Sequence, residues 1–282
     1  MDGGDDIPVE KQREFDRAFD LIKEAQDIDR ALELVEYALE LSTNVPGDSK
    51  FSNATAALAA FTRAVQDIKA ATHLCIGHYY VQALGLLRSV HEAASIGRTM
   101  AHSEKVAMKW MNGEWQSDHK ARQFVANVMY RDHSQEERAE AVEAYEAAYS
   151  NLSEWTHITP RSALAPYIRD RGDGGYSVEL EPYFDEDALN FVLEGITKEA
   201  LFLAYAVRNA APDVAVLGAR WNQDLDDLGQ RVVGDFAVPS GANWEELDYA
   251  HRKIMDNLRN NSELTKSLKR NPNSVGNLLG EA

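Results

Sequence analysis

The segment from His78 to Met100 constrains the fold more than any other part of the chain. When its residues are projected onto an α-helix at about 100° per residue, apolar side chains cover most of the circumference. A helix that is apolar nearly all round is usually buried by its neighbours. The sequence therefore predicts an all-α fold, a helical bundle with this long helix buried at its centre and with an appended C-terminal helical arm.

Apolar side chains recur at helical spacing along most of the remaining chain. Near the N-terminus, Phe15, Phe19 and Ile22 are four and three residues apart, which places them on one face of an amphipathic helix. Residues 176–180 alternate instead and form the candidate strand. The patterns predict roughly eight to ten helices, at residues 9–26, 27–41, 52–77, 78–100, 105–111, 115–131, 135–151, 186–209, 218–230 and 243–259.

Local signals mark where several of these helices begin and end. Gly77 predicts a kink or a turn within the long helical segment that surrounds it. Ser134 followed by Glu137 is a capping-box pattern, and Asp185 can cap the helix that follows it. We expect a disordered N-terminus at residues 1–8, a bundle core at 9–211, an appended helical arm at 212–265 and a disordered tail at 266–282.

The charge and composition of the chain limit which cellular compartment and which kinds of partner are expected. The formal net charge is −17, and such a field repels a phosphate backbone, so RNA is a possible partner that the charge disfavours. The N-terminus is acidic and no apolar signal segment follows it. The stretch Ala70–Val90 holds His73, His78, Gln82 and Arg88, which makes it a poor membrane span. With a single cysteine, Cys75, the chain is expected to be cytoplasmic, without a disulfide and without a membrane partner.

A polar stripe runs along the central helix. Ser89 lies within about 20° of His78 on the helical projection, Glu92 about 40° to one side and Arg88 about 80°. Because an unpaired buried charge costs several kcal/mol, Arg88 and Glu92 need partners. Two interpretations stay open: an ion-pair network that fixes the register of the bundle, or a polar cleft lined by Arg88, Ser89 and Glu92.

A second group of polar residues follows the predicted helix at 135–151. Trp155 and His157 lie at the start of an irregular segment, with Arg161 after them. A contact between His157 and Glu92 would form an acid–base pair, while the alternative is a packed tryptophan and a capping histidine. The candidate catalytic residues are Arg88, Glu92 and His157; the candidate binding residues are Ser89, His78, Trp155 and Arg161.

No cofactor and no metal ion are predicted. The chain contains neither a phosphate-binding loop, nor a dinucleotide fingerprint, nor a paired Glu-x-x-His motif. A metal site built from His73, His78, Glu92 and His157 can be drawn, but His73 and His78 are five residues apart and point in different directions on a helix. The other histidines, His91 among them, show no ligand spacing and are expected to be surface or packing residues.

Three segments of the chain resemble segments of a known family: Leu86-Leu87-Arg88-Ser89-Val90-His91-Glu92, Ala107-Met108-Lys109-Trp110 and Leu152-Ser153-Glu154-Trp155-Thr156-His157. They resemble an uncharacterised microbial helical family, over residues 50–210, that is distantly similar to HEPN-like domains. The resemblance implies a helical domain, with RNA-cleaving toxins and defence proteins among its relatives. HEPN ribonucleases carry an arginine, four to six further residues and then a histidine; Arg98 and His102 have three residues between them, so that motif is missing.

Three hypotheses for the function follow. The favoured one is a binding or interaction module of HEPN-like type, linked by the resemblance to microbial defence, with an unknown protein partner or self-association as a homodimer. One alternative is an atypical HEPN-like ribonuclease or toxin that uses the Arg/Glu/His polar centre. The other alternative is a small-molecule or nucleotide-binding protein that uses the same cleft.

Overall fold

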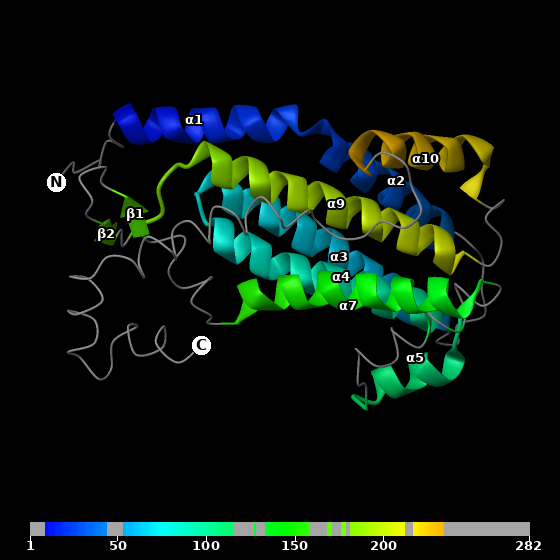
Figure 1. Ribbon diagram of the computed structural model, residues 1–282. Helices are drawn as coiled ribbons and strands as arrows, with labels where there is room; N and C mark the ends of the chain where they lie inside the picture. Colours follow the sequence, from blue (N-terminus) through cyan, green and yellow to red (C-terminus); the bar gives the residue numbers. More distant parts are fainter. Residues whose placement is uncertain are drawn as a thin grey trace, which may run out of the picture.

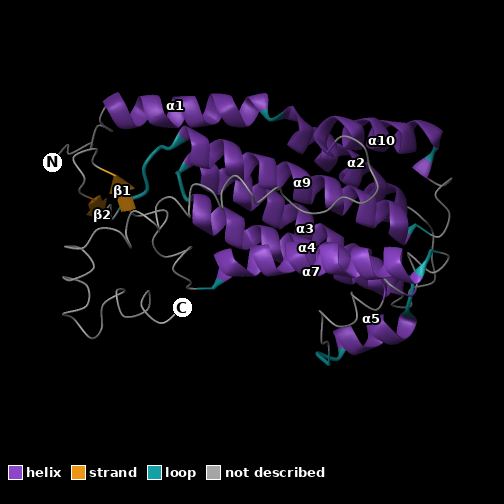
Figure 2. Ribbon diagram, viewed as in Figure 1, coloured by secondary structure: helices purple, strands orange, loops and turns teal. Residues whose placement is uncertain are grey.

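The computed structural model describes residues 9–43, 53–114, 124, 127, 133–157, 168–170, 176–178, 181–211 and 217–233, and it is an all-α bundle, as predicted (Figures 1 and 2). Its helices are α1 (Val9–Glu24), α2 (Gln26–Thr43), α3 (Asn53–Ile76), α4 (Tyr80–Ala101), α5 (Glu104–Met111), α7 (Gln135–Thr156), α9 (Glu186–Ala210) and α10 (Ala219–Val233). Two short strands, β1 (Ile168–Asp170) and β2 (Tyr176–Val178), pair antiparallel beside the bundle.

Helix α4 is the centre of the bundle, which confirms the expectation for the segment after His78. It packs most extensively against α3 and α9, and it also contacts α7 and α5. Leu84, Leu87 and Val90 are at most 2% exposed. The close approach of α3 depends on Gly97, because a Cβ atom there would lie 2.6 Å from the ring of Phe61.

The break expected at Gly77 is a turn between α3 and α4. His78 adopts φ 63°, and among the described residues it is the one non-glycine residue with positive φ. The His78 N–H donates to the Cys75 carbonyl at 3.1 Å, which closes the turn. The buried His78 ring stacks on Phe15 of α1 with centroids 5.1 Å apart, so the turn also fastens α1 to the bundle.

Three helix starts follow the cap chemistry of their first residues. The Ser134 hydroxyl accepts from the Glu137 N–H at 3.2 Å, and the Glu137 carboxylate accepts from the Ser134 N–H at 2.8 Å, which confirms the capping box. Asp185 accepts from the Ala188 N–H at 2.9 Å, as expected. Ser103 in the same way accepts from the Val106 N–H at the start of α5.

The structure adds one strand and lengthens one helix relative to the expectations, and other expectations lie outside the described residues. The expected strand is present at Tyr176–Val178, and its partner at Ile168–Asp170 was not anticipated. Helix α7 continues to Thr156, beyond the predicted end at residue 151, because Trp155 still packs in the core. The expected disorder at 1–8 and 266–282 and the helix at 243–259 lie outside the described residues, as does most of the helix at 115–131.

The C-terminal segment is described over residues 217–233, where α10 packs on α2 and α9. Leu225 and Leu228 belong to the same buried cluster as the rest of the bundle. The Trp221 indole N–H donates to the Leu34 carbonyl of α2 at 2.9 Å. This part of the predicted arm is therefore a layer of the bundle. Among the described helices, none has the length and apolar character that crossing a bilayer requires.

Candidate functional site

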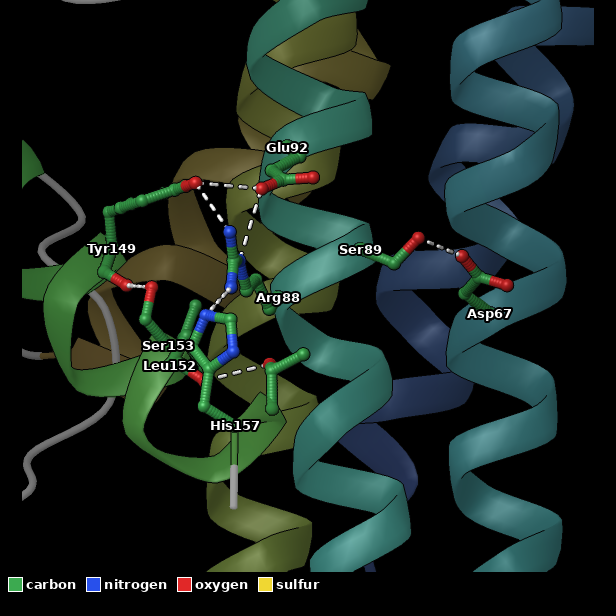
Figure 3. Close-up of polar contacts among 9 residues, drawn as sticks. Asp67, Arg88, Ser89, Glu92, Tyr149, Leu152, Ser153 and His157 are labelled. Carbon is green, nitrogen blue, oxygen red and sulfur yellow. Dashed lines mark hydrogen bonds and ion pairs between the residues drawn. The ribbon is translucent and has the colours of Figure 1, made fainter. Parts of the chain in front are cut away.

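The candidate site lies where α7 crosses α4, and spacing within each helix explains which side chains meet there (Figure 3). Arg88 and Glu92 are four residues apart on α4 and so share one face. Tyr149 of α7 and His157, which caps the C-terminus of α7, are about two turns apart and share the facing side. We call these four residues the Arg88 centre.

Arg88 contacts all three other members of the Arg88 centre. Its Nε donates to Glu92 Oε1 at 3.1 Å, its Nη2 donates to the Tyr149 hydroxyl at 2.7 Å, and its Nη1 lies 3.0 Å from His157 Nε2. The Tyr149 hydroxyl donates in turn to Glu92 Oε1 at 2.9 Å. The predicted candidates Glu92 and His157 thus meet at the Arg88 guanidinium, together with Tyr149, which the sequence analysis did not consider.

The contact with Arg88 determines the protonation pattern of the His157 ring. A guanidinium can only donate, so a hydrogen bond at 3.0 Å requires His157 Nε2 to accept. The proton of the neutral ring then resides on Nδ1. The expected direct pair between His157 and Glu92 is therefore replaced by a contact in which Arg88 stands between the imidazole and the carboxylate.

The pKa values of Arg88 and Tyr149 are both raised above their ordinary values, with burial acting in opposite directions on the two groups. Burial alone would lower the pKa of Arg88, but its contacts with Tyr149 and Glu92 outweigh burial and raise it. The pKa of Tyr149 is raised, first by burial and then by its hydrogen bond to the Glu92 carboxylate. At neutral pH the guanidinium is charged and the phenol carries its proton, as the observed contacts require.

The Arg88 centre is half-buried and remains open to water on one side. The side chains of Arg88 and Glu92 are 19% and 31% exposed, and His157 is exposed. A guanidinium has five N–H groups, and the contacts above use three of them. The centre can therefore still donate from Arg88 to a further group.

The other predicted binding residues lie elsewhere. The Ser89 hydroxyl donates to Asp67 of α3 at 2.6 Å, on the opposite side of α4 from Arg88, as Figure 3 shows. Trp155 is 5% exposed and packs in the core. His78 lies in the turn before α4, more than two helical turns from Arg88, and Arg161 lies outside the described residues. The three described residues, Ser89, His78 and Trp155, therefore do not share one site.

A second polar contact lies deeper, between α4 and α9, and sequence analysis missed it. His91 and Glu199 are 3% and 1% exposed, and His91 Nδ1 lies 3.1 Å from Glu199 Oε2. His91 packs as expected, stacking on Phe202 with centroids 4.5 Å apart. The available signal was an acidic residue, Glu199, among the apolar residues of the predicted helix at 186–209, because a buried carboxylate needs a partner.

The Arg88 centre offers hydrogen bonds and opposite charges. Within the residues that the structure describes, no group of three or more His, Cys, Asp or Glu side chains is arranged to hold a metal ion. Comparison of the chain with protein-family models, curated proteins and solved structures found no match.

Proposed function

We propose that this chain is a HEPN-like binding module that acts in the cytoplasm through contacts with other proteins, in the setting of microbial defence that the resemblance implies. In this proposal the Arg88 centre holds α7 against α4. The surface that the two helices form together then keeps one shape for its partner.

The observation that carries the proposal is the contact between Arg88 and His157. General acid–base catalysis needs a ring nitrogen that can take a proton from the substrate. His157 Nε2 instead accepts an N–H of Arg88 at 3.0 Å, while Glu92 Oε1 accepts from Arg88 and from Tyr149. Groups that satisfy one another are suited to fixing a geometry. The net charge of −17 likewise supports a protein partner over RNA.

An atypical HEPN-like ribonuclease is the second candidate, and one observation favours it. Arg88, Glu92 and His157 meet at a place that water reaches. An RNA phosphate that took the Arg88 guanidinium would release His157 Nε2 to act as a base. The two candidates therefore differ in whether the contact between Arg88 and His157 is permanent or is exchanged for substrate.

The test compares the wild type with Arg88→Ala, His157→Ala and a matched control, Arg220→Ala, which removes an exposed arginine from α10. Each purified protein is incubated with end-labelled single-stranded RNA, and cleavage is followed on denaturing gels. The same proteins, fused to a proximity-labelling enzyme, are expressed in the source cells, and labelled proteins are identified by mass spectrometry. Circular dichroism verifies that every variant is folded.

We expect no RNA cleavage by any of the proteins. We also expect a set of labelled partners that the wild type shares with Arg220→Ala and that Arg88→Ala loses, because the Arg88 centre then no longer fixes how α7 lies on α4. RNA cleavage by the wild type that Arg88→Ala and His157→Ala both lose while remaining folded would replace the binding proposal by the ribonuclease. If all variants label the same partners, the Arg88 centre has no role in partner binding.

A further inference from the structure

Helix α5 presents an apolar and basic outer face. Its inner side packs on α3 and α4 through Ala107, which is 2% exposed. On its outer side Met108 and Met111 are 48% and 42% exposed, one turn apart. Lys105 and Lys109 are exposed beside them and, within the described part of the chain, no ion pair engages either lysine. Flexible methionine side chains on a helix suit a protein contact.

Helix α7 presents exposed acidic side chains at the same end of the bundle. Gly85 of α4 lies near Trp155, and His91 lies near Tyr145, so α7 runs antiparallel to α4. The first turns of α7 therefore lie near the end of α4, from which α5 continues.

These first turns expose Glu136, Glu140 and Glu143 along one face. No ion pair engages them among the residues that the structure describes. The charges of α5 and α7 are thus opposite in sign and lie at the same end of the bundle, and no ion pair joins them among the described residues.

We propose that this face is a homodimer interface, in which α5 of each copy docks its Met108 and Lys109 face on the acidic face of α7 in the other copy. A two-fold axis makes the contact occur twice, because the surface that α5 and α7 form is then self-complementary. The interface neutralises acidic side chains of a chain whose net charge is −17. A second copy of the chain is thus the partner of the proposed binding module, and the dimer rests on the proposed function only in that the partner is a protein.

A charge exchange between two variants tests the dimer on the full chain. One variant carries Lys105→Glu and Lys109→Glu, and the other carries Glu140→Lys and Glu143→Lys; all four residues are exposed, so both variants should fold. Mass is measured by light scattering after size exclusion, and by sedimentation velocity at low and high salt. Met108→Ser/Met111→Ser tests the apolar part of the face without a change of charge.

The wild type is expected at twice the monomer mass of 31.5 kDa, and each charge variant alone at the monomer mass. An equimolar mixture of the two variants is expected to return to the dimer mass, because both α5–α7 contacts of the mixed dimer are again complementary. High salt and Met108→Ser/Met111→Ser should each weaken the dimer. A wild type that stays monomeric at 100 µM, charge variants that still dimerise, or a mixture that stays monomeric would each overturn the proposal. The RNA-cleavage and partner-labelling assays test the proposed function, whereas the measured mass tests the dimer, so that failure of one can be told from failure of the other.

Discussion

Gly97 lies where α4 packs closely on α3. Adding one methyl group there should lower stability through packing by more than it raises stability through helix propensity. A Cβ atom at Gly97 would lie 2.6 Å, 2.9 Å and 3.0 Å from Cε1, Cδ1 and Cζ of Phe61. Carbon atoms in contact need roughly 3.5 Å, so the ring of Phe61 would have to move by nearly an ångström. Phe61 is 3% exposed, which leaves the ring little room to move.

The expected magnitude is the difference between two opposed terms. Replacing glycine by alanine within a helix stabilises it by about 0.8–1 kcal/mol, whereas overpacking a well-packed core costs about 1–3 kcal/mol. Gly97→Ala should therefore lower the free energy of unfolding by up to about 2 kcal/mol. Gly85→Ala is the matched control on the same helix, because its nearest neighbour would be the Trp155 carbonyl oxygen at 3.9 Å. That variant should gain most of the helix-propensity term.

Urea unfolding followed by circular dichroism, together with thermal melting, measures both variants. For a chain of this size about 1 kcal/mol corresponds to roughly 2–4 °C in Tm, so Gly97→Ala should melt several degrees below Gly85→Ala. In a Phe61→Leu background the smaller side chain should remove the penalty, and Gly97→Ala should then become neutral or stabilising. The reasoning is refuted if Gly97→Ala is as stable as Gly85→Ala, or if Phe61→Leu leaves its penalty unchanged.

Three further predictions concern side chains that are buried or partly buried. Tyr149→Phe should cost about 1 kcal/mol in urea unfolding, because it removes the hydroxyl that contacts Arg88 and Glu92 but leaves those two half-exposed partners 3.1 Å apart; an unchanged midpoint would contradict this. Burial lowers the pKa of His78 from 6.5, so the folded state binds the proton less tightly than the unfolded state, and stability should be full above about pH 6.5 and fall as the pH decreases below it. His78→Asn, which tolerates positive φ, should lose less stability between pH 7 and pH 5 than the wild type, and parallel losses would refute the assignment. Burial raises the pKa of Cys75 to about 12, so a thiol reagent at pH 8 should react only after unfolding, and fast reaction of the folded chain would show the burial to be wrong.

The parts of the fold that could be predicted from the sequence are those that local chemistry decides. The apolar circumference of α4 requires burial, Asp185 and Ser134 carry their capping groups a few residues from their partners, and Arg88 is one turn from Glu92. Such relations span at most four residues and are therefore visible in a sequence pattern.

The relations that escaped prediction join residues far apart in the chain. Tyr149 meets Glu92 across 57 residues, and His91 meets Glu199 across 108. Helical spacing places each residue on a face of its own helix but does not say which helix that face meets. His157 shows the same limit: its role was linked to Glu92, while the side chain it reaches is Arg88.

The packing of α2 on α9 and the bond from Trp221 to Leu34 have a consequence for how this protein is made. The indole and the carbonyl that it reaches are 187 residues apart, and α2 contacts α9 more than it contacts α3, its neighbour in sequence. Chains emerge from the ribosome at about 5–20 residues per second, so α2 waits on the order of ten seconds or more for the helices that will cover it. During synthesis the apolar side of α2 that faces α9 and α10 is thus exposed until almost all of the bundle has been translated, and this is the interval in which a chaperone would be expected to bind.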